Sequence, residues 1–450
     1  MDCEGVFTET SDEQCECEQN CSRFLAPISK LKRKTLAQMI ERGLLNEDMQ
    51  ICLVRELHAE FLVNGLRGLP GGFAMLDSSK PWICYWIVHA LYLIRQEPYD
   101  LYPRMISTLS HMQIPGSGYA GGPNQMPHCA ATYAAILALC TLREKDGYES
   151  IDRAGIYNFF LSCRDPSGGF TMHEGGEVDS RGTYTVVAVA SLLNMLTPEL
   201  TRGTAEYLLR CQTYEGGFGG EPGNEAHGGY NFCAVAALLI LGESHRIALD
   251  SLQHWLLQRQ MRVEGGFQGR TNKLVDSCYS FWQGAAVALV QIIRRGGSHT
   301  TDMNDFLRPD SEVEAEAEDG EEDVIDLDAA ASRGESRSVR KTTATNGHLL
   351  FNQDALQAYI LRCAQDPEGG LKDKPGKPRD FYHSCYSLSG LSVAQNYSDG
   401  AEGSPAHVHG DLNNLLEPTS VVYNVGLSAL RESLTYFAEK PSEHSVLVNM

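Results

Sequence analysis

The sequence predicts an all-α protein in which six helix pairs close into a ring, an α/α toroid built from repeats of about 50 residues. One or two glycines before an aromatic or leucine residue form a marker that recurs six times, at Phe73, Tyr119, Phe170, Phe218, Phe267 and Leu371. Successive markers lie 46, 51, 48, 49 and 104 residues apart, so the last step equals one period plus about 55 inserted residues. Units of this kind bury their apolar faces only by stacking on their neighbours.

Each repeat contains two helical patterns. An alanine- and leucine-rich pattern follows the marker after about ten residues, as at 230–241 and 279–290. A second pattern, such as 251–260, leads into the next marker. No convincing run of alternating apolar and polar residues predicts a strand. An open superhelix of the same units is the alternative, and we prefer the ring because it brings equivalent polar positions together.

Composition divides the chain further. Between Asp302 and Asp328 there are thirteen acidic residues and one arginine, more than half of the net charge of −21. Such a segment favours a solvated, disordered insertion between repeats five and six. We therefore expect a disordered acidic N-terminus at 1–30 and repeats one to five at 31–298. The acidic disordered insertion follows at 299–346, repeat six with the closing helices at 347–440, and a C-terminal tail at 441–450.

The overall charge and the cysteines exclude several classes of function. A net charge of −21 argues against nucleic acid as a partner. No apolar run approaches the ~18 residues of a membrane helix, so we expect no membrane insertion. Fourteen scattered cysteines without a secretory signal indicate reduced thiols and a cytoplasmic protein. Cys15, Cys17 and Cys21 are spaced as in some soft-metal sites, but no second ligand cluster follows them, and their role stays open.

Counting nine residues on from each marker gives a second regularity. These positions hold one apolar residue and five polar ones, namely Trp82, His128, Asp179, His227, Asp276 and Asp380. Equivalent positions in stacked repeats occupy equivalent places, so these side chains should ring one mouth of the toroid, at the starts of the inner helices. Aspartates there are also compatible with plain helix N-caps, a role that needs no chemistry.

Capping does not explain two neighbours of this ring. Cys278 follows Asp276 by two residues in the fifth unit, and His383 follows Asp380 by three in the sixth. Aspartate, cysteine and histidine are ligand types that zinc accepts, and three protein ligands with a vacant fourth position are the pattern of a catalytic zinc site. A substrate thiol binds such a position as thiolate.

Hydrogen-bond donors gather around this predicted zinc site. Arg270 and Lys273 precede Asp276, His227 and Tyr230 lie in the preceding unit, and Lys374 follows the sixth marker. With the helix N-termini they make a pocket suited to a diphosphate. Each of them singly is equally compatible with a solvated loop charge.

Long motifs in these same units resemble the β subunit of protein farnesyltransferase. The fifth unit reads Gly-Gly-Phe-Gln-Gly-Arg at 265–270, Asn-Lys-Leu-Val-Asp at 272–276 and Cys-Tyr-Ser-Phe-Trp at 278–282. Glu-Ala-His-Gly-Gly-Tyr at 225–230 and Arg-Asp-Phe-Tyr-His at 379–383 belong to the same pattern. The similarity runs from about Leu57 to Lys440 without the insertion, which resembles a feature of plant versions.

The resemblance implies a fold, an activity and partners. The chain would be the catalytic half of a heterodimer with a helical-repeat α subunit. It would transfer farnesyl from farnesyl diphosphate to the cysteine of a C-terminal C-a-a-X motif in acceptor proteins such as small GTPases. One zinc ion would be held by Asp276, Cys278 and His383, and Asp373 would contact magnesium.

The resemblance also implies roles for further residues. The catalytic residues would be the three zinc ligands with Tyr279 and Lys273. Farnesyl diphosphate would contact His227, Tyr230, Arg270, Lys273, Tyr279, Trp282 and Tyr184. The acceptor peptide would contact Trp82, Trp86, Arg181 and Tyr382.

Other members of this fold are alternatives. The type I geranylgeranyltransferase β subunit shares the ring, the zinc site and the partner, and is the nearest one. Terpene cyclases use an aspartate-rich motif, and the chain has no Asp-Asp pair. Thioester-containing domains require a Gly-Cys-Gly-Glu-Gln run, which is also missing. A scaffold protein would not need a thiol, an imidazole and a carboxylate at one mouth.

Overall fold

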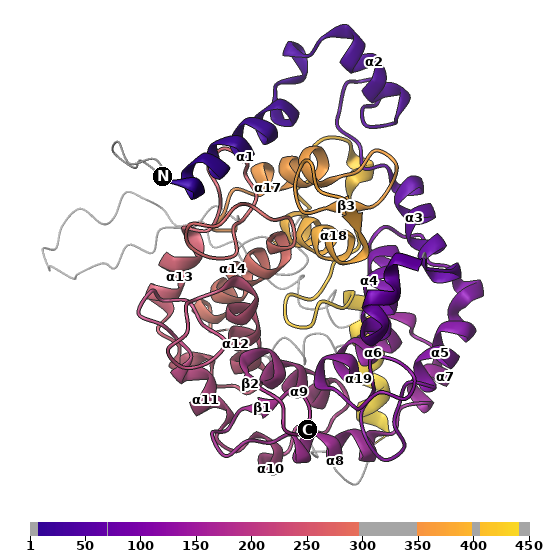
Figure 1. The fold of residues 1–450 in the computed structure, drawn as a ribbon, viewed down its shortest axis with the longest axis vertical. Helices are drawn as coiled ribbons and strands as arrows, with labels where there is room; N and C mark the ends of the chain where they lie inside the picture. The colour runs from indigo at the N-terminus through magenta and orange to yellow at the C-terminus, as the bar shows by residue number, and fades with distance from the viewer. Residues whose placement is uncertain (1–7, 70, 297–348, 398–405, 441–450) are drawn as a thin grey trace, which may run out of the picture.

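A computed structural model describes residues 8–69, 71–296, 349–397 and 406–440 (Figure 1). Six inner helices surround a common axis. Each packs on the next and the last packs on the first, so the ring is closed. They are α4 (Lys80–Leu93), α6 (Cys129–Leu142), α9 (Ser180–Leu192), α12 (Gly228–Ile240), α14 (Tyr279–Arg294) and α18 (Phe381–Asn396). The predicted all-α ring is confirmed, and an open superhelix is excluded.

A second layer of helices lies outside the inner ring (Figure 1). Most residues of the inner helices are buried, whereas the outer helices leave one face to solvent. The outer helices are α3 (Arg55–Arg67), α5 (Tyr102–Ser110), α8 (Arg153–Ser162), α11 (Thr204–Arg210), α13 (Leu249–Leu257) and α17 (Gln353–Tyr359) with its π-helical extension η5 (Ile360–Ala364). Short connecting turns are α7 (Lys145–Glu149), α10 (Pro198–Thr201), η3 (Tyr99–Leu101) and η4 (Ser244–Arg246).

The glycine markers form tight turns at one mouth of the ring. Gly168 has φ +97°, and a Cβ there would meet the carbonyl oxygen of Gly203 at 2.1 Å, so the turn requires glycine. Short antiparallel pairs follow, β1 (Phe170–Thr171) with β2 (Val178–Asp179) and β3 (Leu371–Lys372) with β4 (Arg379–Asp380). These two-residue strands, which no sequence pattern predicted, carry the chain from the marker to the start of an inner helix.

The first repeat departs from this geometry. Its marker lies in the 3₁₀ helix η2 (Gly71–Ser79), which runs directly into α4. Trp82 therefore lies inside the first turn of α4 rather than before the helix. Trp82 thus lies at the start of its inner helix, as expected, but no hairpin separates the marker from the helix in this unit.

The expectation of a disordered N-terminus was wrong for residues 9–25, which form α1 (Glu9–Leu25). A capping box between Thr8 and Ser11 starts this helix. Its buried stripe holds Gln14, whose amide donates to the buried Glu264 at 2.9 Å. The guanidinium of Arg362 caps the other end by donating to the carbonyl oxygens of residues 25 and 26. The acidic composition predicted disorder, but the segment forms a helix that packs on the rest of the chain through a narrow polar stripe.

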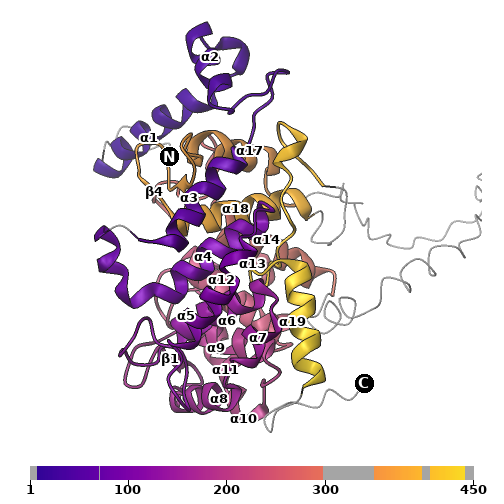
Figure 2. The ribbon, with the colours of Figure 1, turned by 90° about the vertical axis from the view of Figure 1, so that its right-hand side faces the viewer.

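The helix α2 (Arg33–Glu41) projects beyond the ring (Figures 1 and 2). It follows η1 (Ile28–Lys30) and has no buried residue. The ring itself begins with α3, so the predicted boundary at residue 31 was too early. The predicted insertion at 299–346 and the tail at 441–450 lie outside the described residues.

The C-terminal segment closes one end of the ring. After η6 (Leu412–Asn414), residues 419–425 pass across the axis, and α19 (Leu427–Glu439) packs on α6 and α9. Figure 2 shows α19 on the side opposite β1 and β4, so the closed end faces away from the hairpins. Among the described helices, none is both long enough and apolar enough to cross a bilayer.

Candidate active site

Side chains at the ninth position act as helix caps around the open mouth. In four units they accept hydrogen bonds from backbone N–H groups of the first turn, through His128, Asp179, His227 and Asp380. In the fifth unit Oδ1 of Asp276 accepts from the backbone N–H of Cys278 at 2.9 Å. These side chains therefore do cap the inner helices, and the capping hydrogen bonds also fix the direction in which the side chains face.

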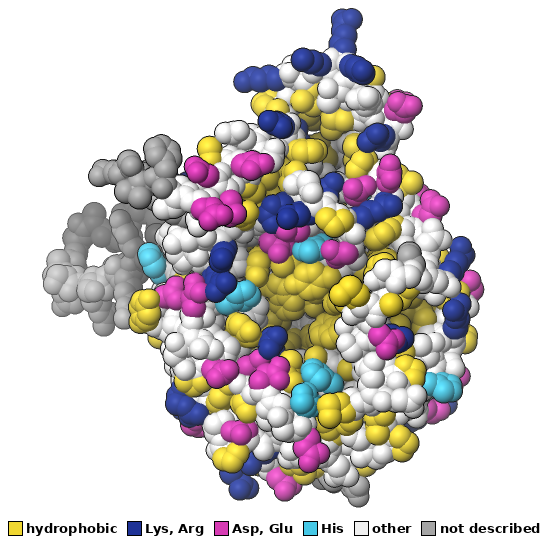
Figure 3. Space-filling model, in the orientation of Figure 1, with side chains coloured by type: hydrophobic (Ala, Val, Ile, Leu, Met, Phe, Trp, Pro, Cys, Tyr) yellow, Lys and Arg dark blue, Asp and Glu magenta, His cyan; other side chains and the backbone are white. Residues whose placement is uncertain are grey.

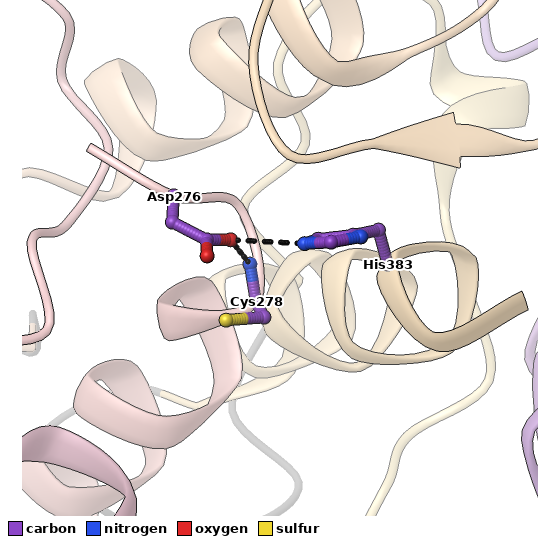
Figure 4. Close-up of side chains that lie close together, drawn as sticks. All are labelled: Asp276, Cys278 and His383. Carbon is purple, nitrogen blue, oxygen red and sulfur yellow. Dashed lines mark hydrogen bonds and ion pairs between the residues drawn. The ribbon is translucent and has the colours of Figure 1, made fainter. Parts of the chain in front are cut away.

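Asp276, Cys278 and His383 come together at this mouth (Figure 4). One ligand atom from each lies within 4.8 Å of the others. Two come from the start of α14 and the third from the first turn of α18, so the two inner helices position the set. It is the one such group of histidine, cysteine and acidic residues within the part of the chain that the structure describes.

Hydrogen bonds orient the imidazole of His383 within this group. Nδ1 lies 2.6 Å from Oδ2 of Asp380, which holds the proton on that nitrogen. Nε2 lies 3.3 Å from Oδ1 of Asp276 and faces the other two ligand atoms. A carboxylate behind a metal-binding histidine is the usual arrangement around zinc.

The electrostatics of the group favour a divalent cation. Burial raises the pKa of the Cys278 thiol, and the nearby Asp276 carboxylate raises it further. Burial lowers the pKa of His383, but hydrogen bonds to Asp276 and Asp380 outweigh it and raise the value to about 10. Two carboxylates thus converge on one imidazole beside a neutral thiol, and a bound cation would balance the carboxylates and favour the thiolate of Cys278. The residues present fit zinc.

Asp373 lies next to this group. Its carbonyl oxygen accepts from the backbone N–H of Ser277 at 3.0 Å and from the hydroxyl of Tyr359 at 2.8 Å. Its carboxylate pairs with the ammonium of Lys374 at 2.5 Å. Burial and the neighbouring Asp276 raise the pKa of Asp373. A second cation is compatible with this carboxylate, although Lys374 already provides a partner.

Donors line the next part of the rim. Nδ1 of His227 accepts from the backbone N–H of Gly229 at 3.2 Å, so the neutral ring carries its proton on Nε2. This Nε2 lies 3.0 Å from the hydroxyl of Tyr279, which is then free to donate outward. Burial, and then Arg270, lower the pKa of His227, which keeps the ring neutral. The ring of Tyr230 lies 5.3 Å from that of His227.

The cations on this rim are only partly engaged. Arg270 pairs with Glu225 at 2.7 Å, and both side chains are partly exposed. Arg181 pairs with Asp179 at 2.5 Å and lies over the ring of Tyr230 at 5.2 Å. The Arg270–Glu225 pair is exposed and exchanges partners at little cost, so a bound anion can compete for Arg270, whereas the carboxylate that holds Arg181 is buried.

Aromatic side chains form a continuous wall below the rim. Trp82 stacks on Trp86 at 5.7 Å, and Trp86 meets Tyr382 edge-on at 5.5 Å. Tyr382 lies 4.9 Å from Tyr386, whose ring lies 4.3 Å from that of Trp282. The wall therefore joins α4, α18 and α14. Figure 3 shows a hydrophobic hollow in the centre of one face of the ring, with histidine, acidic and basic side chains around its edge.

The C-terminal segment forms the floor beneath this wall. Three inner-helix tyrosines donate to its backbone carbonyl oxygens, Tyr85 to residue 424 at 2.7 Å, Tyr133 to residue 423 at 3.2 Å and Tyr184 to residue 422 at 2.8 Å. Tyr184 is thus buried and contacts the floor of the ring. Its position suits contact with an apolar chain rather than with a diphosphate.

Sequence reasoning missed two contributors to the site. It treated Asp380 as a cap and overlooked its contact with His383, although the Asp-x-x-His spacing at a helix start signals such a pair. It also placed no function on residues 419–425, because this segment belongs to no repeat. The predicted zinc ligands come together as expected, and Trp82, Trp86 and Tyr382 share one wall.

Comparison with known proteins places this geometry in a family. The prenyltransferase alpha-alpha toroid domain matches residues 53–425. The protein farnesyltransferase subunit beta of Arabidopsis thaliana is 43% identical over 85% of this chain and 82% of its own length. The geranylgeranyl transferase type-1 subunit beta of the same organism is 29% identical over 60% of this chain and 59% of its own length.

A solved structure supports the fold. A chain of the Candida albicans protein geranylgeranyltransferase-I complexed with GGPP has a TM-score of 0.61 at 20% identity, and the match covers 86% of this chain and 98% of that one. The ring, the matched domain and the identity to the Arabidopsis protein agree. The chain belongs to the family of protein farnesyltransferase β subunits, which carry the prenyltransferase α/α toroid.

Proposed function

We propose that this chain is the catalytic β subunit of a protein farnesyltransferase. It transfers farnesyl from farnesyl diphosphate to the cysteine of a C-terminal C-a-a-X motif. The observation that carries the proposal is the Asp276–Cys278–His383 group at the lip of an aromatic hollow, with donors on the adjacent rim. We expect a cytoplasmic heterodimer with an α subunit and acceptors such as small GTPases.

The metal at this group is proposed to be zinc. Zinc bound there would hold the acceptor cysteine as a thiolate at neutral pH, which keeps its sulfur nucleophilic. His383 is oriented for this by Asp380, and the buried Cys278 offers a soft ligand. Magnesium at Asp373 remains the weaker part of the proposal, since Lys374 already pairs with that carboxylate.

Residues of the rim stabilise the leaving diphosphate. In the transfer, sulfur bonds to carbon one of the farnesyl chain while the carbon–oxygen bond to diphosphate breaks, so negative charge gathers on the departing oxygens. The hydroxyl of Tyr279, which accepts from the Nε2–H of His227, donates its own proton to these oxygens, and Lys273 and Arg270 supply positive charge. Tyr230 supports the ring of His227.

The two substrates contact different parts of the hollow. Trp282 and Tyr184 contact the farnesyl chain, while Trp82, Trp86 and Tyr382 contact the apolar residues of the acceptor peptide. Arg181, on the rim, lies near the peptide's carboxyl end. Excluding water from this wall strengthens the charge interactions at the rim above it.

A type I geranylgeranyltransferase β subunit is the second candidate. Higher identity to the farnesyl relative and the bulk of Trp82 favour the first. The test is co-expression with an α subunit, measurement of bound zinc, and competition between farnesyl and geranylgeranyl diphosphate on peptides ending in methionine or leucine. Preference for geranylgeranyl diphosphate and leucine would establish the alternative.

A further inference from the structure

Two buried serines join the two helices that carry the proposed zinc ligands. Ser277 stands between Asp276 and Cys278, immediately before α14. Ser387 lies about one turn beyond His383 in α18. Both serines are fully buried, and the hydroxyl of Ser387 donates to Oγ of Ser277 at 2.8 Å. This hydrogen bond therefore links the two halves of the ligand set.

Further hydrogen bonds tie Ser277 to the hairpin that precedes α18. Its hydroxyl donates to the carbonyl oxygen of Lys372 at 2.8 Å, and its backbone N–H donates to the carbonyl oxygen of Asp373 at 3.0 Å. Lys372 belongs to β3, whose partner β4 leads directly into α18. Ser277 is thus held by three hydrogen bonds to the part of the chain that carries His383.

The hydroxyl of Ser387 differs from those of its neighbours in α18. A serine inside a helix can satisfy its hydroxyl at the carbonyl oxygen four residues back. The hydroxyls of Ser384 and Ser389 do so, at 2.6 and 3.0 Å. That of Ser387 leaves its own helix and bonds to Ser277 instead. Its hydrogen bond is therefore a contact between elements, not a local one.

The two halves of the ligand set already stand at a spacing that zinc accepts. Nε2 of His383 lies 3.3 Å from Oδ1 of Asp276. Ligand atoms that surround a tetrahedral ion at about 2.0 Å lie about 3.3 Å from one another. A site held at this spacing before the ion arrives loses less free energy in ordering its ligands, and so binds the ion more tightly.

We propose that Ser277 and Ser387 are positioning residues for zinc, and that their hydrogen bond sets the separation of the two ligand-bearing elements. The inference rests on the zinc site of the proposed function. The two serines act through the backbone, because their hydroxyls bond to one another and to Lys372 rather than to a ligand side chain. Removing either hydroxyl breaks the link and leaves all three ligands in place.

The test measures the zinc affinity of the full-length chain purified with an α subunit. Bound metal is removed with a chelator, zinc is restored, and the dissociation constant is determined by competition with a chromophoric chelator. Ser277→Ala and Ser387→Ala should each weaken zinc binding by about tenfold, the lower end of the range for groups that orient metal ligands.

Ser389 offers a matched control in the same helix. It is as fully buried as Ser387, but its hydroxyl bonds only within α18. Ser389→Ala should therefore leave zinc affinity unchanged. Thermal unfolding of the zinc-free proteins should show losses of stability of similar size in Ser387→Ala and Ser389→Ala. Equal losses of zinc affinity in these two variants would overturn the proposal, since any buried hydroxyl of α18 would then have the same effect.

The double variant tests whether the two serines act as one unit. If their mutual hydrogen bond carries the effect, Ser277→Ala with Ser387→Ala loses no more affinity than the weaker-binding single variant. Losses that multiply to about a hundredfold would show two independent effects and overturn the proposal. Ser277→Gly removes the same hydroxyl and replaces any single variant that does not fold.

The unsubstituted protein separates this inference from the proposed function. Tight zinc binding by the unsubstituted protein, with the same affinity in both serine variants, would overturn the positioning role alone. Failure of the unsubstituted protein to bind zinc would overturn the zinc site and this inference with it. Tight binding that both serine variants weaken, while Ser389→Ala does not, is the result that the structure predicts.

Discussion

The carboxylate of Asp380 lies 2.6 Å from Nδ1 of His383, three residues further along α18, and leaves Nε2 of that ring facing Asp276. Replacing the carboxylate with an amide keeps the helix cap but removes the charge that makes the imidazole a stronger ligand. We predict that Asp380→Asn weakens zinc binding by about tenfold, measured by competition with a chelator.

Asp179 offers a matched control for this prediction. It occupies the same ring position in the third unit and caps the start of α9, but no histidine among the described residues is hydrogen-bonded to it. Asp179→Asn should leave zinc affinity unchanged. Equal losses in the two variants would show that capping, not orientation of the imidazole, explains the effect.

Trp82 provides a test of lipid length. Burying five more carbons would favour the longer lipid by roughly 4 kcal/mol, at ~0.8 kcal/mol per carbon, so hydrophobicity alone cannot select farnesyl. Selection needs bulk, and the ring of Trp82 lies 5.7 Å from those of Trp86 and Tyr133 in the hollow. Trp82→Thr should shift product towards geranylgeranyl in direct competition of the two diphosphates.

The alternative role of Trp82 is packing between α4 and α6. Under that role the variant loses stability, while the ratio of the two products stays the same. Zinc content and binding of the α subunit should be measured on the same sample, so that an unchanged ratio in an intact protein counts against the steric role.

The buried His58 predicts a loss of stability in acid. Its Nδ1 accepts from the backbone N–H of Gly370 at 2.8 Å and its Nε2 donates to Oε1 of Gln365 at 2.9 Å, so no site is left for a second proton. Burial lowers its pKa to about 4. The unfolded chain takes up this proton near pH 6.5, so stability is complete above that pH and falls as the pH drops towards 4.

The measurement is the free energy of unfolding from pH 7.5 to 4.5 for the unsubstituted protein and for His58→Gln. The glutamine has no titrating group, so the unsubstituted protein should lose roughly 2 kcal/mol more across this range than the variant does. Parallel curves would show that His58 is not held neutral in the folded state.

The ring and the approach of Asp276, Cys278 and His383 to one another could be predicted because both follow from repetition. Residues nine to twelve places after each glycine marker fall at the starts of the inner helices, which is why Cys278 and His383, more than 100 residues apart, were expected at one mouth. The first unit differs in its local geometry, because the 3₁₀ helix η2 runs directly into α4 and places Trp82 within the first turn.

The parts that escaped prediction lie outside the repeats. The helix α1 docks through Gln14, Cys17 and Cys21, a stripe too polar to be recognised as a buried face. The floor at 419–425 is held by tyrosine hydroxyls donating to backbone carbonyl oxygens, and carbonyl positions leave no trace in side-chain patterns. Long-range contacts of this kind appear only when the fold is known.

The most direct test of the proposed function is the zinc content and turnover of Cys278→Ala and His383→Ala, with Cys233→Ala as the control for a buried thiol elsewhere in the ring. Losing one of three protein ligands leaves the ion weakly held, so both variants should lose bound zinc and farnesyl transfer together, while the control keeps both. Stoichiometric zinc and an unchanged rate in the Cys278 and His383 variants would contradict the assignment of this site.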